Sequence, residues 1–252
     1  MAGSLGCTAE VVDGTGNDGG GGSGGGGGGA GICTSYIGDG CKPGEEQSCG
    51  YLPPEDTMTR HCKLVDEFCT TRWAYEDCNT PLVLSFDSAP VSFVADASAG
   101  FTVNGTKSLV TDWPTAATPW LAIDRDGSGR IEDGAELFGS MSPLASGGTA
   151  ANGFVALREL DQNGDGQLTA DDPAFAKLLV WSDRDADRSS EAGELQGAAA
   201  FRIVAIDLGY KSEPRCDARG NCEVERAGFR YLDAAGRMRE GTVIDVHLAP
   251  QR

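Results

Sequence analysis

The sequence predicts an α+β protein in which short helices around acidic loops pack with β-hairpins, preceded by a small disulfide-rich head. Three observations predict this class. Six of the nine cysteines fall within residues 32–79. Apolar and polar residues alternate after Pro81 and again near the C-terminus, as in half-buried strands. Between these strands, from about residue 120 to residue 200, acidic turns are flanked by apolar residues at helical spacing.

Composition divides the chain into three predicted parts. Residues 1–31 include a nearly pure glycine run over 19–31, which has no side chains to bury and is typical of a flexible tether. Residues 32–79 are predicted to form a Cys-rich disulfide module. Residues 80–252 are predicted to form an α+β domain with its own core, ending in β-hairpins over 201–248 around the turn "DAAG".

The cysteine content of this 26.1 kDa chain indicates an oxidising compartment. No gap between the head cysteines has the Cys-x2-Cys spacing of zinc modules, so three disulfides are expected there, and the sequence leaves their pairing open. A fourth disulfide is expected across the turn "DARGN". The cysteines predicted to form disulfides are Cys33, Cys41, Cys49, Cys62, Cys69, Cys78, Cys216 and Cys222.

The remaining cysteine, Cys7, ends the segment "MAGSLGC" before the glycine tether. This arrangement is similar to the processed end of bacterial lipoproteins, although Ser4 and Leu5 depart from the usual order. We therefore expect Cys7 to be lipidated; the alternative is a stray thiol near the terminus. The sequence has no run of about 18–20 apolar residues and no signal-peptide core. We expect an exported protein, either extracellular or an outer-membrane or cell-surface lipoprotein.

The formal net charge of −18 argues against nucleic acid or an anionic membrane surface as a partner. Half of this excess lies within residues 121–196, where 15 Asp/Glu and 6 Lys/Arg give a net charge of −9. Most of these acids fall at metal-ligand spacing. The charge distribution therefore predicts local cation sites rather than a general aid to solubility.

The segment "DQNGDGQLTADD", residues 161–172, has the pattern of a calcium loop. Calcium takes six to eight oxygen ligands, and a 12-residue EF-hand loop supplies them from positions 1, 3, 5, 7, 9 and 12, with glycine at position 6 and an apolar residue at position 8. Gly166 and Leu168 fit the last two requirements, and Phe154, Leu157 and Leu160 form a helical stripe before the loop. The predicted ligands are Asp161, Asn163, Asp165, Gln167 through its carbonyl, Thr169 and Asp172.

An upstream segment, residues 124–136, has the same pattern with one change. The final carboxylate comes one residue late, at Glu136, because Ala135 occupies position 12. We expect a calcium site in which Glu136 closes a loop stretched by one residue. The predicted ligands are Asp124, Asp126, Ser128, Arg130 through its carbonyl, Glu132 and Glu136.

A downstream segment, residues 183–194, has a complete ligand set and two departures. Arg188 replaces the turn glycine, where a positive φ costs of order 1 kcal/mol, and Ser190 replaces the apolar residue. A degenerate loop that binds nothing is the alternative to a site here. The predicted ligands are Asp183, Asp185, Asp187, Ser189, Glu191 and Glu194.

Taken together, "LAIDRDGSGRIEDGAELFG", "NGFVALRELDQNGDGQLTADDPAF" and "LLVWSDRDADRSSEAGEL" resemble a calcium-binding block of three EF-hand-like, dockerin-like loops in haemolysin-type (RTX) secreted bacterial proteins. The late glutamate in "GAELFG" is a feature of that block and supports Glu136 as a ligand. The resemblance covers about 120–210. The whole chain resembles Cys-rich bacterial lipoproteins without an assigned activity.

These features predict an exported, surface-tethered, non-enzymatic protein whose EF-hand-like loops bind Ca²⁺ mainly to stabilise the fold. Only His61 and His247 could act as near-neutral bases and no nucleophile motif appears, so no catalytic residue is predicted. An adhesion protein that contacts a polysaccharide or a protein is the alternative. A calcium sensor is disfavoured because only ten residues, 173–182, separate the second and third loops.

Overall fold

A computed structural model describes the chain from Cys33 to Ala249 with gaps. The predicted leader and tether, including Cys7, lie outside the described residues. Among the described residues, no helix is long and apolar enough to cross a membrane. The described ranges are 33, 35–38, 41–49, 58–64, 66, 68–74, 80–95, 99–103 and 110–249.

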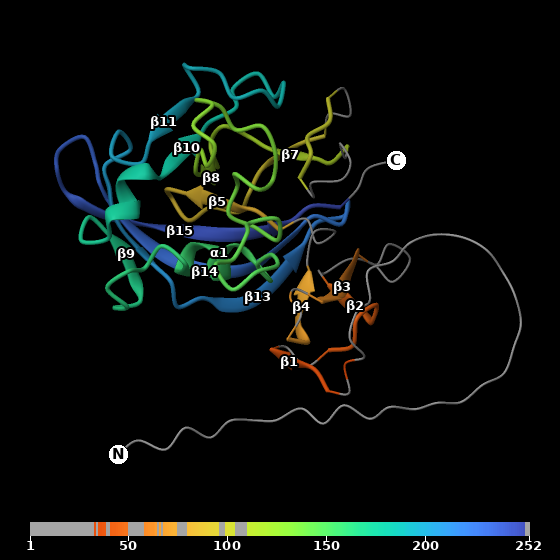
Figure 1. The fold of residues 1–252 in the computed structure, drawn as a ribbon. Coiled ribbons are helices and arrows are strands. Elements are labelled where there is room, and N and C mark those ends of the chain that lie inside the picture. Colours follow the sequence, from red (N-terminus) through yellow and green to blue (C-terminus); the bar gives the residue numbers. More distant parts are fainter. Residues whose placement is uncertain are drawn as a thin grey trace, which may run out of the picture. The chain divides into compact units, whose positions relative to one another are not determined.

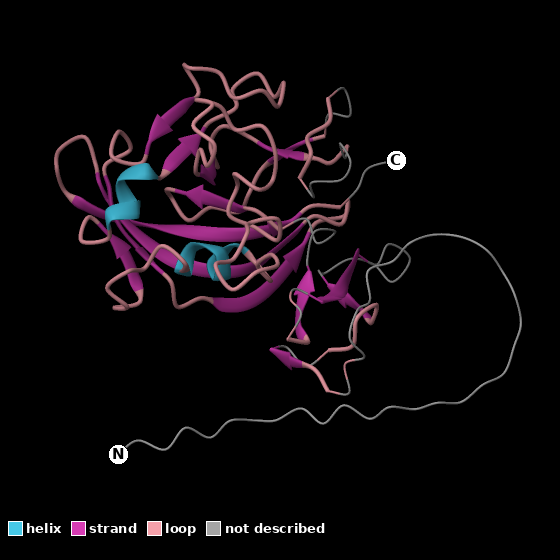
Figure 2. Cartoon of the chain, viewed as in Figure 1, coloured by secondary structure: helices cyan, strands magenta, loops and turns pink. Residues whose placement is uncertain are grey.

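The predicted α+β class is wrong, because the described residues are mostly β-sheet (Figures 1 and 2). Helical structure there is confined to α1, Gly153–Arg158, and the 3-10 turn η1, Pro173–Lys177. Phe154 and Leu157 of α1 are fully buried, as the helical stripe predicts. No described helix lies directly before or after the first and third acidic loops, so the predicted short helices are missing there; among the described residues, the second loop alone lies between helical turns, α1 and η1.

The central element is a nine-stranded sheet with the order β11-β10-β8-β5-β15-β14-β12-β9, in which β13 pairs with β14 off this path. All strand pairs in this sheet are antiparallel. A separate two-stranded sheet joins β6, Phe93–Val94, to β7, Trp113–Pro114. The nine strands are β5 Leu82–Ser85, β8 Trp120–Ala122, β9 Gln167–Thr169, β10 Leu179–Trp181, β11 Leu195–Gly197, β12 Ile203–Asp207, β13 Lys211–Cys216, β14 Cys222–Leu232 and β15 Met238–His247.

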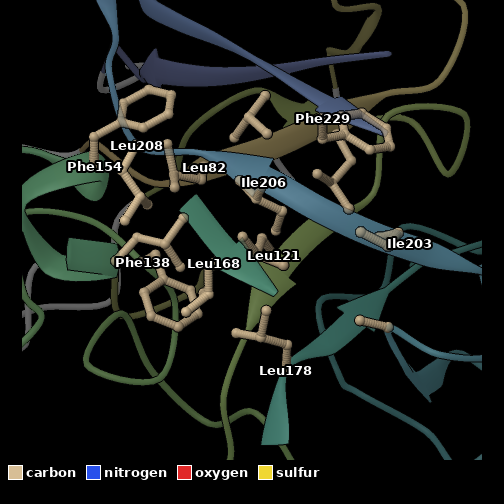
Figure 3. Packing of buried hydrophobic residues seen from close by; sticks show 14 of the residues in the cluster. Leu82, Leu121, Phe138, Phe154, Leu168, Leu178, Ile203, Ile206, Leu208 and Phe229 are labelled. Carbon is tan, nitrogen blue, oxygen red and sulfur yellow. The ribbon is translucent and has the colours of Figure 1, made fainter. Parts of the chain in front are cut away.

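Apolar side chains cover both faces of this sheet. Side chains alternate between faces along a strand, so Leu82 and Leu84 of β5 join one hydrophobic cluster and Val83 joins the other. Figure 3 shows the first cluster, in which Phe154 of α1 packs near Leu208. The second cluster contains three buried tryptophans. They are Trp113, Trp120 and Trp181, with ring centroids 4.9–5.5 Å apart for the two pairs that involve Trp113.

Strands rather than helices lead into two of the acidic loops. β8 ends just before Asp124 and β10 ends just before Asp183, and these two strands pair with each other. The segments that leave the loops pair back on the entering strands, since Ala122 forms a bridge with Leu137 and β10 pairs with β11. These short apolar segments are therefore held by long-range sheet pairing, which local periodicity does not reveal.

The Cys-rich head contains a four-stranded sheet with the order β1-β4-β3-β2. Two disulfides join Cys33 to Cys69 and Cys41 to Cys62, which confirms disulfides rather than a zinc module for these four cysteines. Cys78 and the side chain of Cys49 lie outside what the structure describes. The strands are β1 Ile37–Gly38, β2 Glu46–Cys49, β3 Met58–Leu64 and β4 Thr70–Ala74.

Two antiparallel hairpins occupy the C-terminal part. β14 and β15 are the long strands in Figure 1 and flank a turn in which the Asp233 N–H donates to the Arg237 carbonyl at 2.9 Å. β13 and β14 flank the "DARGN" turn. The predicted disulfide between Cys216 and Cys222 is present and joins directly paired residues of these strands.

Candidate metal centre

The three acidic loops share one internal hydrogen-bond pattern. In each loop the carboxylate at position 1 accepts the backbone N–H of position 6, at 2.9, 3.0 and 2.9 Å. This contact holds the first carboxylate against the backbone of the turn. The three pairs are Asp124 with Gly129, Asp161 with Gly166, and Asp183 with Arg188.

The last carboxylate of each loop makes a second shared contact. It accepts the backbone N–H of position 2, at 3.0, 2.9 and 2.6 Å. The first and last acids are thereby brought to the same side of the loop, although the first loop is one residue longer. The three pairs are Glu136 with Arg125, Asp172 with Gln162, and Glu194 with Arg184.

Backbone conformation repeats in the same way. Positions 4 and 6 have positive φ in all three loops, and four of these six residues are glycine. The third loop has Arg188 at φ 64°, as its place at the turn position predicts, and Ala186 at φ 59°, which the loop pattern did not predict. The loop therefore keeps the shared conformation at the cost of strain at two non-glycine residues.

The Arg188 side chain extends into the protein interior. It is buried, its Nη2 donates to the Thr111 carbonyl at 2.8 Å, and its guanidinium lies 5.4 Å from the centroid of the Trp113 ring. These contacts direct the positive charge toward Thr111 and Trp113. They offset part of the strain and explain how arginine replaces glycine here.

Ser190 joins the third loop to the first. Its hydroxyl accepts the Ile131 N–H at 2.6 Å and donates to the Ile131 carbonyl at 3.3 Å, and both residues are buried. Ile131 and Ser190 each occupy position 8 of their loops. The serine that departs from the apolar rule therefore provides the contact between two loops 59 residues apart in the chain.

The second loop joins the sheet instead. Gln167, Leu168 and Thr169 form β9, which pairs with Ala205–Asp207 of β12. Leu168 is fully buried in the first hydrophobic cluster, as expected for position 8 (Figure 3). The three loops are thus fixed by different neighbours, although their internal hydrogen bonds agree.

Burial and hydrogen bonds shift the pKa values of several loop acids. Burial raises the pKa of Glu136, and the nearby charges of Asp126 and Asp124 raise it further against two backbone hydrogen bonds. Burial also raises the pKa of Asp183, to which the charge of Glu194 adds. In contrast, the backbone N–H of Gly129 lowers the pKa of the half-buried Asp124 carboxyl.

Two buried carboxylate oxygens in the third loop have no hydrogen bond of normal geometry among the described residues: Asp183 Oδ1 and Glu194 Oε2. A buried anionic oxygen without a partner is costly, and a bound cation would satisfy it. The donor set of the loop, carboxylates with hydroxyl and carbonyl oxygens, is the set that calcium prefers. These residues therefore fit a calcium ion.

The structure gathers some predicted ligands and leaves others apart. One ligand atom from each of Asp124, Asp126 and Glu136 lies within 4.8 Å of the other two, and the same holds for the three acids Asp183, Asp185 and Asp187. Glu132 and Glu191, both at position 9, belong to neither group of three. The second loop forms no comparable group of His, Cys, Asp and Glu among the described residues, since its ligand set includes an amide and a hydroxyl.

Sequence reasoning missed one further group, which consists of Glu225, Asp245 and His247. It lies on β14 and β15. The signal was the segment "TVIDVHL", where Asp245 and His247 interrupt an apolar strand two residues apart and so face the same way.

Comparison with known proteins places the loops within one matched region. The profile of the SPM domain family matches residues 82–249, which include all three loops. Among curated proteins, iron-regulated protein FrpA of Neisseria meningitidis serogroup C is 36% identical over 159 residues. That alignment covers 61% of the chain and 14% of FrpA, so the chain corresponds to a small part of that relative.

Proposed function

The chain belongs to the SPM domain family, and on that premise we propose that its SPM domain is a non-enzymatic calcium-binding module of an exported bacterial protein. The single observation that carries the proposal is the pair of buried oxygens Asp183 Oδ1 and Glu194 Oε2, which lack a hydrogen bond of normal geometry among the described residues, within a loop whose conformation two other acidic loops repeat. The resemblance of the three loops to a block of haemolysin-type (RTX) secreted proteins supports calcium as the ion.

The proposed role of the ion is to stabilise the fold. Loop 183–194 connects β10 to β11, and loop 124–136 is closed by the Ala122–Leu137 bridge, so a cation in either loop would hold strands of the main sheet together. A ligand that binds only the folded state stabilises it by mass action; in about 1 mM calcium, a site with a Kd of about 0.1 mM adds about 1.4 kcal/mol. Three such sites would matter for a domain of this size.

A sensor is less well supported, because a sensor opens a pair of helices to expose a groove. The first and third loops lie between strands, and Ser190 ties them together. Adhesion to a polysaccharide or a protein is compatible with a stabilising role. Among the described residues, no single surface indicates such a partner.

Export and surface attachment are part of the proposal. The head and the Cys216–Cys222 hairpin carry disulfides, which form and persist in oxidising compartments. The segment "MAGSLGC" supports a lipid on Cys7 as a membrane tether. Mass spectrometry of the protein from its native host tests this step: a diacylglyceryl mass on Cys7 supports the tether, and an unmodified Cys7 in the membrane fraction argues against it.

Calcium binding itself is tested by isothermal titration of the chelator-treated full chain. We expect more than one calcium ion per chain, and fewer ions for Asp183→Asn and for Asp172→Asn. Asp171→Asn is the matched control, because Asp171 is exposed and precedes the closing acid at a non-ligand position. Absence of binding to the folded wild type, or equal binding by all variants, would refute the proposal.

A further inference from the structure

A second kind of cation site lies on the long C-terminal strands. Asp245 and His247 are alternate residues of β15 and face the same side of the sheet. Glu225 belongs to β14, where the register with β15 shifts between Glu223 and Arg226. This irregularity places an acidic side chain beside the two polar residues of β15, and one ligand atom from each lies within 4.8 Å of the other two.

The three side chains are enclosed and incompletely satisfied. Asp245 is fully buried, and the side chains of His247 and Glu225 are 7% and 14% exposed. His247 Nε2 lies 3.1 Å from Glu225 Oε2, and Asp245 Oδ2 accepts the Gly153 N–H at 2.5 Å. Two atoms remain buried without a hydrogen-bond partner among the described residues: Asp245 Oδ1 and His247 Nδ1.

Among the described residues, no positive charge contributes to the pKa of Asp245. Burial raises the pKa of Asp245 well above its ordinary value, and the negative charge of Glu225 raises it further, while the Gly153 N–H acts in the opposite direction. Two carboxylates and an imidazole thus share one enclosed space with spare acceptor atoms. A divalent cation would supply both the missing charge and the missing partners.

We propose that Glu225, Asp245 and His247 form a binding site for a first-row divalent transition metal ion such as Zn²⁺. The ligand chemistry selects this class, because an imidazole nitrogen with carboxylate oxygens suits zinc and its neighbours. Calcium takes six to eight oxygen ligands, which the acidic loops offer and these three side chains do not. The half-buried Glu225 forms the most accessible side of the cluster.

The test is a Co²⁺ titration of the full chain in excess calcium, so that the acidic loops do not take up the probe. We expect one Co²⁺ per chain with a visible absorption spectrum, and displacement of that spectrum by Zn²⁺. Asp245→Asn keeps an acceptor for the Gly153 N–H and removes the anionic ligand, so its affinity should fall by about 100-fold or more, since loss of an outer-shell partner alone costs up to about that factor.

Controls separate this site from adventitious binding. His61→Gln removes the other histidine of the chain and should leave the Co²⁺ spectrum unchanged, whereas His247→Gln should abolish it. If Asp245→Asn does not unfold cooperatively, Glu225→Gln at the more accessible side decides the question. The proposal would be overturned if the wild type did not bind Co²⁺ stoichiometrically. It would also be overturned if the Glu225 and His247 variants bound Co²⁺ as tightly as the wild type, or if His61→Gln lost binding. The Glu225, Asp245 and His247 variants leave the ligands of the acidic loops unchanged, so they distinguish this site from the loops.

Discussion

Replacement of Ser190 tests the link between the first and third loops. The Ser190 hydroxyl is the acceptor for the buried Ile131 N–H, at 2.6 Å. Ser190→Ala leaves that N–H without an acceptor in a site where Ile131 and Ser190 are 2% and 3% exposed, so water cannot readily replace the hydroxyl. An unsatisfied buried donor costs about 1–3 kcal/mol. For a domain of this size, the unfolding midpoint should fall by about 2 to 12 °C.

Ser190→Val sharpens the test, because the EF-hand pattern prefers an apolar residue at position 8. The structure predicts that valine also destabilises the protein, since its side chain cannot accept the Ile131 N–H. The assay is thermal and denaturant unfolding in saturating calcium. Ser212→Ala is the control, because Ser212 is exposed on β13 and lies outside the three loops. A valine variant as stable as the wild type, or more stable, would refute the reasoning.

Three other positions, Gly153, Asp245 and Arg188, give further predictions. Gly153→Ala should cost about 1–3 kcal/mol, because its Cβ would lie 2.4 Å from Leu82 Cγ and 2.5 Å from the Phe138 carbonyl; Gly209→Ala, where a Cβ meets nothing within 4 Å, should be neutral by denaturant unfolding. The pKa of Asp245 is raised in the folded state, so at pH values between 3.8 and that raised pKa the folded protein binds more protons than the unfolded chain. In metal-free protein, the free energy of unfolding should therefore fall as pH rises from 3.8 through the pKa of Asp245 in the folded state. Free energies of unfolding of Asp245→Asn and wild type that change in parallel with pH would contradict this. Arg188→Gly should relieve strain of about 1 kcal/mol and still be destabilising in an unfolding assay, because it loses the bond to the Thr111 carbonyl and the contact with Trp113; a more stable variant would contradict this.

The sequence alone identified the loops because their spacing is local. Positions 1, 6 and 12 are set by residues within one short segment, and Asp161, Gly166 and Asp172 make the contacts that such a segment requires. The positive φ of Arg188 was likewise foreseeable from its place in the pattern. The calcium assignment remains a prediction from this spacing and from the resemblance.

The predicted helices around the first and third loops are absent because long-range contacts determine the structure there. Leu179–Trp181 is three residues long, too short for its period to be read, and it becomes a strand because it pairs with Trp120–Ala122. Ser190 looked like a defect because its partner, Ile131, is distant in the chain. Asp245 and His247 are two residues apart in the sequence, but Glu225 joins them only through the register shift between β14 and β15.

The thermal unfolding midpoint of the full chain, measured in calcium and in chelator, shows whether calcium stabilises this domain. At about 1 mM calcium, three sites of about 0.1 mM Kd contribute about 4 kcal/mol together, which corresponds to a rise of about 8 to 16 °C over the chelated protein. Replacing a predicted ligand, in Asp183→Asn or in Asp172→Asn, should reduce that rise in the midpoint. A midpoint that is the same in calcium and in chelator would show that calcium does not stabilise the fold.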